Sequence, residues 1–283
     1  MTIDYEKEYN NRARVPEHPQ IFDAWARDAA AYRAARPRAE LGLSYGPSPR
    51  QILDIFPAGD ADAPLALFVH GGWWKSLHPS SFSHMAAGPN ARGVTVAVAG
   101  YDLCPTVTIA QITDQIRNAC LALWRKYHKR FVVYGHSAGG HLSACMTATN
   151  WTTLDADAPA DLVPAGYAIS GVFDLEPLRH TSLSTDFKLT ETTAHLISPI
   201  HWPVPAGRTL DAVVGALESS EFLRQSQDMA KAWGGVAHTH YAAIADTNHF
   251  TVLTPLTEAN SGMTARVTEL ARHPQGVSRR QVF

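Results

Sequence analysis

The sequence feature that most constrains the fold is a G-x-S-x-G motif, GHSAG, at residues 135–139. It follows the apolar run FVVY at 131–134, which is typical of a buried parallel strand, and it precedes a small-residue segment with helical character. A serine in so sharp a turn takes a strained backbone conformation, and side chains at Gly135 and Gly139 would collide with the flanking strand and helix. The motif therefore predicts a strand–turn–helix unit that exposes Ser137 at the carboxyl edge of a sheet.

The length of the chain favours one domain. Its 283 residues are enough for a substantial core, and no internal repeat or low-complexity tract is visible. We expect a single α/β domain over residues 1–283, with an N-terminal helical extension at 1–40 and a lid insertion at 171–208. The extension contains apolar residues at helical spacing in 19–35. The insertion is longer than an ordinary connection and rich in proline, which suits short helices over the edge of the sheet.

Composition and charge favour a small-molecule substrate. The net charge is −2 with scattered Lys and Arg, so there is no basic stripe for nucleic acid and no polybasic patch for a membrane. The charged start of the chain lacks an apolar targeting segment, and no run of roughly eighteen apolar residues occurs, so we expect a cytoplasmic protein. Three cysteines at unrelated spacings suit reduced, mostly buried thiols. The sequence leaves open whether the chain forms a homodimer.

Apolar runs and amphipathic segments alternate along the chain. Short β-branched and aromatic runs predict strands, and apolar residues at helical spacing predict helices. The predicted strands cover residues 44–45, 51–56, 65–69, 94–98, 131–134, 165–170, 210–214 and 237–244, and the main predicted helices cover 19–35, 109–127, 221–233 and a segment from Thr251. This order predicts an α/β fold with a mostly parallel central sheet flanked by helices.

A nucleophilic serine needs a general base, and the loop after the last predicted strand contains one. His249 lies there, within DTNHF at residues 246–250. The acid that orients the histidine should follow the penultimate strand, where Glu218 is the carboxylate of the loop. Asp174 and Asp246 are alternatives for the acid, and Glu218 could instead cap the next helix.

The remaining histidines do not indicate a metal site. His238 and His240 share one predicted strand, but no carboxylate or cysteine stands at ligand spacing. Packing or surface roles suit these two and His136, which fills a variable position of the serine motif. We expect neither a metal nor an organic cofactor.

A second informative segment, HGGWW at residues 70–74, directly follows a predicted central strand. Glycines there permit a close approach, so the backbone N–H groups of Gly72 and Trp73 are predicted to face the nucleophile. Together with the N–H of Ala138 they would form an oxyanion hole for the tetrahedral intermediate. The His70 side chain is expected to brace this loop rather than to transfer protons.

Taken together, these motifs resemble those of a known enzyme family. The matching segments are HGGWW (70–74), which fits HGGxW, YDLCP (101–105), GHSAGGH (135–141), ISP (197–199), ESSEFLRQS (218–226) and DTNHF (246–250). Over most of its length, from about residue 65 onward, the chain is similar to the kynurenine formamidase (arylformamidase) group of α/β-hydrolases. The resemblance implies an α/β-hydrolase fold in which Ser137 is the nucleophile, His249 the base, and Glu218 occupies the place of an acid that is usually aspartate.

The resemblance and the order of the triad predict a cofactor-independent serine hydrolase. The favoured reaction is hydrolysis of N-formylkynurenine, or of a related aryl formamide, to the aryl amine and formate. A carboxylesterase for small aryl or alkyl esters is the alternative, because the family includes both activities. A non-catalytic binding module with a hydrolase fold is a third hypothesis, and the complete Ser–acid–His order argues against it.

Five aromatic residues are predicted to contact the substrate. Trp73 and Trp74 follow the oxyanion glycines and would restrict the acyl side of the site. Phe173, Phe187 and Trp202 lie in the predicted lid and would offer an apolar slot to an aryl leaving group. The alternative is that both tryptophans point into the core, since large aromatic side chains are buried on average.

Overall fold

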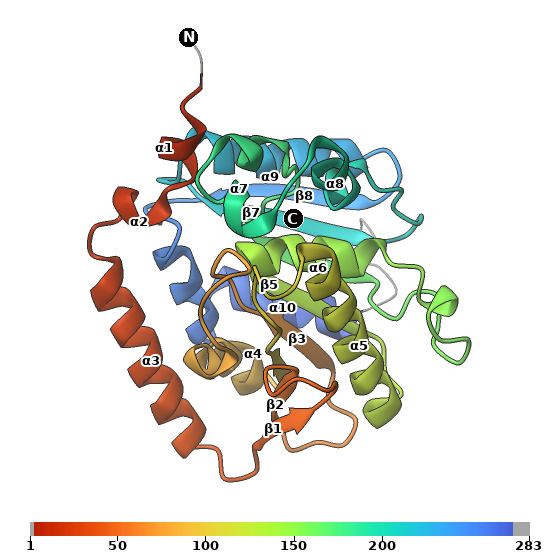
Figure 1. Cartoon of the computed structure of the whole chain (residues 1–283). Coiled ribbons are helices and arrows are strands. Elements are labelled where there is room, and N and C mark those ends of the chain that lie inside the picture. Colours follow the sequence, from red (N-terminus) through yellow and green to blue (C-terminus); the bar gives the residue numbers. More distant parts are fainter. Residues whose placement is uncertain (1–2, 274–283) are drawn as a thin grey trace, which may run out of the picture.

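An eight-stranded sheet forms the centre of the protein, whose computed structural model describes residues 3–273 (Figure 1). The strands are β1 (Glu40–Ser44), β2 (Ile52–Phe56), β3 (Leu65–Val69), β4 (Thr95–Ala99), β5 (Phe131–His136), β6 (Ala165–Ile169), β7 (Thr209–Gly215) and β8 (His238–Ile244). Their order is β1-β2-β4-β3-β5-β6-β7-β8. Strand β2 is antiparallel to β1 and β4, and the other neighbouring pairs are parallel. The predicted α/β architecture is confirmed.

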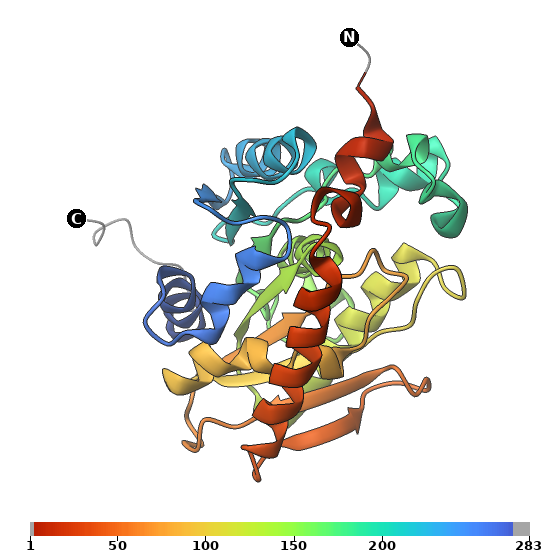
Figure 2. The same ribbon diagram turned by 90° about the vertical axis from the view of Figure 1, so that its left-hand side faces the viewer.

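Helices cover both faces of this sheet (Figures 1 and 2). One face packs against α5 (Ile109–Tyr127), α6 (Ala138–Ala148) and α9 (Ser220–Trp233), and the other against α3 (His18–Ala34), α4 (Ala87–Ala91) and α10 (Gly262–Arg272). Because both faces are covered, every residue of β3, β4 and β5 is buried, which explains why these strands are mostly apolar.

The first strand differs from its predicted bounds. The sequence indicated a strand at 44–45, whereas β1 spans Glu40–Ser44 and pairs with β2 across an irregular register. Its residues are exposed or half-buried because β1 is the edge of the sheet. An edge strand with a solvated face carries little apolar signal, which is why the sequence pattern missed its start.

The N-terminal extension contains two short helices before α3, namely α1 (Tyr5–Tyr9) and α2 (Asn11–Arg14). The side chains of Asp4 and Asn10 cap these helices by accepting hydrogen bonds from backbone N–H groups. Figure 2 shows α1 and α2 stacked above α3, which runs across the molecule. Residues 1–2 of the predicted extension and residues 274–283 of the predicted domain lie outside the described residues.

The predicted insertion at 171–208 forms short helices. These are the 3₁₀-helix η4 (Glu176–His180), α7 (Ser184–Phe187), α8 (Glu191–Leu196) and the 3₁₀-helix η5 (Pro199–His201). Its role as a lid stays a prediction.

The C-terminal helix begins later than predicted. From Thr251 the chain forms the 3₁₀-helix η6 (Thr251–Thr257), which contains Pro255, and the regular helix α10 starts at Gly262 after a Ser261 N-cap. Proline inside the segment removes a hydrogen-bond donor, which disfavours a continuous α-helix there.

Over residues 3–273, no helix is long and apolar enough to cross a lipid bilayer. In the same part of the chain, no three His, Cys, Asp or Glu side chains come together as a metal site.

Candidate active site

The turn between β5 and α6 carries Ser137 in a strained conformation, with φ 57° and ψ −115°. The neighbouring glycines are required by close packing. A Cβ at Gly139 would lie 1.9 Å from the Val69 carbonyl oxygen, and one at Gly135 would lie 2.4 Å from the Gly139 carbonyl oxygen. The expected reasons for both glycines are thus confirmed, and Ser137 stands at the carboxyl end of the central strands.

His249 lies in the loop between β8 and η6 and contacts Glu218, in the loop between β7 and α9. The distance between His249 Nδ1 and Glu218 Oε2 is 2.6 Å, and both side chains are almost fully buried. A carboxylate can only accept a hydrogen bond, so Nδ1 is the donor, and in the neutral ring Nε2 is then the nitrogen that can accept a proton. This tautomer is the one that a general base needs.

Two further donors hold the Glu218 carboxylate in place. Its Oε1 accepts from Ser170 Oγ at 2.5 Å and from the Gly215 N–H at 2.7 Å. The sequence interpretation missed Ser170, although a hydroxyl residue directly after the strand next to β7 could have indicated it. Ser219, not Glu218, caps α9, because its side chain accepts from the Phe222 N–H. The capping alternative for Glu218 is therefore wrong.

The two alternative acids do not reach the histidine. Asp174 Oδ1 accepts from the Glu176 N–H in a local turn. Asp246 is exposed and has a φ of 57°. Within residues 3–273, neither carboxylate has a hydrogen bond or an ion pair to His249.

Ser137 and His249 line one narrow pocket of about 40 Å³. No hydrogen bond joins Ser137 Oγ to the imidazole among the described residues. Hydrogen bonds between catalytic groups are often loose in a free enzyme and tighten when substrate binds. The Ser137 and His249 side chains nevertheless border the same small volume.

The loop after β3 lies against the serine turn. A Cβ at Gly71 would lie 3.1 Å from the Ser137 Cβ, and Gly72 has a φ of 110°, which a larger residue would adopt only with strain. In the described part of the chain, the N–H groups of Gly72 and Trp73 have no hydrogen-bond acceptor. The N–H of Ala138, at the start of α6, has no acceptor within the helix.

His70 stabilises this loop from behind. Its ring stacks on Tyr101 with 4.4 Å between centroids, and its Nδ1 donates to the Gly71 carbonyl oxygen at 2.7 Å. The Tyr101 hydroxyl donates to the His70 carbonyl oxygen. Burial lowers the pKa of His70 to about 3, so the ring is neutral and packed, as its expected bracing role requires.

His136, in the variable position of the serine motif, holds the His249 loop. Its Nε2 donates to the His249 carbonyl oxygen at 2.7 Å. Burial, and then the nearby His249, lower its pKa well below the ordinary histidine value. His136 is therefore a neutral packing residue, whereas His238 and His240 are exposed on β8.

Only one of the five aromatic residues predicted to contact substrate lines the pocket that contains Ser137. Trp73 does so, and its contact with substrate stays a prediction. Trp74 is fully buried and packs edge-on against His141 and Phe187. Both tryptophans have positive φ, 53° and 51°, and their ring centroids lie 6.2 Å apart, with Trp73 at the pocket and Trp74 in the core.

The prediction of substrate contact is wrong for the other four aromatic residues. Trp74 and Phe187 belong to the core on the α5 face, and Phe173 packs in the core beside α9. The Trp202 side chain lies away from this pocket. Its Nε1 donates to the Leu196 carbonyl oxygen, and its ring lies under the Arg117 guanidinium.

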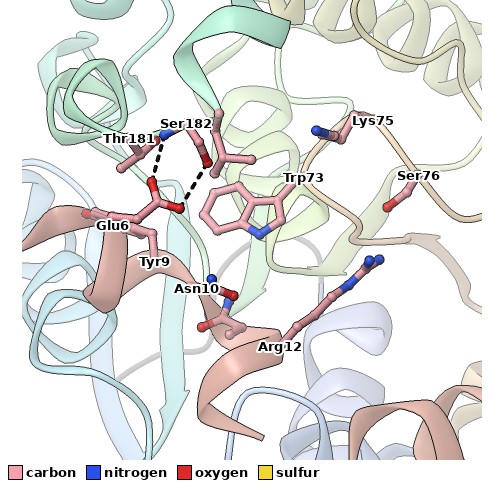
Figure 3. A pocket seen from close by; sticks show the side chains of 11 residues that line it. Glu6, Tyr9, Asn10, Arg12, Trp73, Lys75, Ser76, Thr181 and Ser182 are labelled. Carbon is pink, nitrogen blue, oxygen red and sulfur yellow. Dashed lines mark hydrogen bonds between the residues drawn. The ribbon is translucent and has the colours of Figure 1, made fainter. Parts of the chain in front are cut away.

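A larger cavity of about 360 Å³ lies beside the narrow pocket (Figure 3). The two share Asn11, Arg12, Trp73 and Ser76 in their walls. Sequence interpretation did not assign Asn11 or Arg12 to the site. The capping residues Asp4 and Asn10 could have indicated two short helices, but nothing local indicates where those helices dock.

Comparisons with known proteins agree with this geometry. No protein-family model matches the chain. It is 26% identical to the kynurenine formamidase of Danio rerio over 230 residues, which cover 78% of each chain. It is 30% identical to the kynurenine formamidase of Drosophila melanogaster over 203 residues, which cover 66% of each chain.

Solved structures also resemble this chain. A candidate thioesterase from Silicibacter sp. TM1040 has a TM-score of 0.86 and 32% identity, covering 94% of this chain and 100% of that one. An esterase from Pyrobaculum calidifontis has a TM-score of 0.65 at 13% identity, covering 91% and 94%, and so shares the fold. These relatives set aside the hypothesis of a non-catalytic binding module. The chain belongs to the kynurenine formamidase-like group of α/β-hydrolases and is a hydrolytic enzyme.

Proposed function

We propose that Ser137, His249 and Glu218 form a catalytic triad that cleaves a small acyl group from an aryl amide or ester. The observation that carries this proposal is the 2.6 Å contact between His249 Nδ1 and a buried Glu218, beside a strained serine in the same pocket. A buried carboxylate on Nδ1 stabilises the imidazolium that forms when Nε2 accepts a proton.

The reaction would proceed in two steps. Ser137 Oγ attacks the acyl carbonyl carbon while His249 Nε2 takes the hydroxyl proton. The bond to the leaving group then breaks, and His249 returns the proton to the departing nitrogen or oxygen. In the second step His249 removes a proton from water, whose oxygen attacks the acyl-serine carbonyl carbon; the bond to Ser137 Oγ then breaks, His249 returns the proton to Oγ, and the carboxylic acid is released.

We assign the oxyanion hole to the N–H groups of Gly72, Trp73 and Ala138. All three come from segments that meet at Ser137, and the Gly71 contact supports this close approach. Preorganised N–H groups stabilise the negative oxygen of the tetrahedral intermediate, and each typically contributes about 10²- to 10³-fold in kcat.

The favoured substrate is an aryl formamide such as N-formylkynurenine. The narrow pocket of about 40 Å³ supports a small acyl group, because this volume holds only about two or three water molecules. The larger cavity of about 360 Å³ would take the aromatic leaving group. The name of the zebrafish and fruit-fly relatives agrees with a formamide substrate.

A carboxylesterase is the second candidate. The relative from Silicibacter, at 32% identity, is a candidate thioesterase, and thioester cleavage would use the same serine chemistry. An ester and a formamide of the same aryl group differ in the leaving atom, so the two candidates separate by substrate preference.

The test is a series of formyl, acetyl and butyryl derivatives on one aryl leaving group, each as amide and as ester. We expect kcat/KM to fall steeply from formyl to butyryl. Each methylene group that the pocket excludes should cost about 1–3 kcal/mol of transition-state binding. Trp73→Ala should flatten the series by admitting longer chains, and Ser137→Ala should abolish turnover. Equal rates on acetyl and butyryl esters, unchanged by Trp73→Ala, would favour the general carboxylesterase.

We also propose that residues 171–208 contribute to a lid and that the enzyme works in the cytoplasm. Thr181, Ser182 and Leu183 from this segment line the larger cavity, which supports a covering role. All three cysteines are free thiols and buried, which suits a reducing compartment.

A further inference from the structure

The N-terminal helix α2 brings an unpaired amide to the catalytic pocket. Asn11 is 4% exposed, and within residues 3–273 its Nδ2 has no hydrogen-bond acceptor. The residue lines the narrow pocket with Ser137 and His249 and also the larger cavity. A buried donor without an acceptor is costly, so such a group normally has a partner, and here that partner would be a ligand.

Arg12 is adjacent in sequence and lines the same two cavities. Among the described residues, its guanidinium has no carboxylate within 4.0 Å, and its recorded contact is the Phe22 ring at 5.7 Å. Figure 3 shows its side chain extending from α2 towards Ser76, on the far side of Trp73 from Glu6.

The other charged side chains of the larger cavity are already engaged. Lys75 pairs with Asp186. Glu6 accepts from the backbone N–H of Ser182 at 2.7 Å and from its hydroxyl at 2.9 Å, which holds the carboxylate against η4 and α7. Arg12 is therefore the cation of this cavity that is left for a ligand.

We propose that Asn11 and Arg12 form a carboxylate subsite, and that the preferred substrate carries a carboxylate on its aryl leaving group. A guanidinium and an amide N–H together suit the acceptor-only oxygens of a carboxylate. The inference rests on the proposed acyl transfer at Ser137. With the acyl group in the narrow pocket, the leaving group enters the larger cavity across the wall that contains both residues.

Binding is measured by calorimetry on Ser137→Ala protein, so that the result does not depend on turnover. The probes are N-formylkynurenine and its α-carboxamide, which differ in the negative charge. We expect the acid to bind about 10- to 100-fold more tightly than the amide, as hydrogen bonds to charged groups allow. Adding Arg12→Gln should remove most of this preference, and Arg12→Lys should keep part of it.

Two further variants sharpen the test. Asn11→Asp replaces the donor with a negative charge and should reverse the preference, with circular dichroism and thermal unfolding confirming that the protein is folded. Arg27→Gln removes an exposed arginine that pairs with Asp28 on α3, and it should leave the preference unchanged. Equal affinity for acid and amide, or a preference that survives Arg12→Gln, would overturn the subsite.

A separate experiment tests the proposed function. If wild-type protein released neither formate from N-formylkynurenine nor acetate from phenyl acetate, the acyl-transfer mechanism would be refuted. A preference for the acid that Arg12→Gln removed would still establish the carboxylate subsite in that case.

Discussion

Glu218 is the most constrained side chain of the candidate site. Its carboxylate accepts from His249 Nδ1, Ser170 Oγ and the Gly215 N–H, and it is 7% exposed. Three donors on a buried carboxylate fix its orientation. The residue lies three positions beyond the end of β7.

We expect Glu218→Gln to lower kcat by roughly 10³-fold or more, by analogy with removal of the acid charge in other triads. The amide keeps the shape but cannot stabilise an imidazolium. Its NH2 group is also a hydrogen-bond donor, so it cannot accept from a donor that the carboxylate oxygen in its place accepts from. Asp174→Asn is the matched control, because Asp174 lies in a separate turn, and its kcat should change little. Steady-state kinetics on one aryl substrate measures both, and the opposite order of effects would assign the acid to Asp174.

At this scale the sequence predicted what depends on local motifs. Ser137 and Glu218 each follow a buried, mostly apolar strand, and His249 follows the last strand in the order, so their meeting at one sheet edge could be deduced. The direction of the Trp74 side chain could not, because it depends on two consecutive residues with positive φ. Non-glycine residues seldom adopt that conformation, and no residue type at 73 or 74 signals it.

Among the elements, the N-terminal helices are the part of the site that the sequence did not predict. Helices α1 and α2 have five and four residues, too short to be stable alone. They are held by distant partners instead. The Tyr9 hydroxyl donates to Glu221 Oε2 at 2.9 Å and accepts from Gln225 Nε2 at 2.9 Å. Contacts of this kind, between residues far apart in the chain, leave no local pattern in the amino-acid sequence.

Tyr9→Phe should loosen this docking without unfolding the protein. Arg224 still pairs with Glu221, and Gln225 Nε2 still donates to the Asp174 carbonyl oxygen, so the loss should be about 1 kcal/mol. We expect faster amide hydrogen exchange across residues 5–14 and little change in the central strands. Tyr5→Phe is the control, since no hydrogen bond of the Tyr5 hydroxyl is recorded among the described residues. Equal exchange in both variants would argue against a role for the Tyr9 hydroxyl.

For the whole molecule, four buried neutral histidines link stability to pH. Burial lowers the pKa of His70 to about 3 and of His84 and His141 to about 4, and it lowers that of His136 well below the usual value. In the unfolded chain each would titrate near 6.5. As the pH falls below that value the unfolded state binds protons that the folded state does not, so stability decreases from there down to the folded pKa values.

Four such groups should make the free energy of unfolding about 5 kcal/mol lower at pH 5.5 than at pH 7.5. Urea unfolding at the two pH values measures the difference. His141→Gln should remove about a quarter of it, whereas His238→Gln, at an exposed position, should not alter it. A free energy of unfolding that is the same at both pH values would contradict the neutral buried state of these rings.

The docking of α1 sets an order for the assembly of the pocket during synthesis. Tyr9 is synthesised before its partner Glu221, which follows 212 positions later, and before His249, which follows later still. The nascent chain must therefore keep its N-terminal segment undocked until nearly all of the domain has emerged. Since that segment contains part of the pocket wall, a ribosome-bound fragment that ends before α9 has neither a complete wall nor His249. We therefore expect hydrolytic activity to arise only after α9 and the His249 loop have emerged from the ribosome.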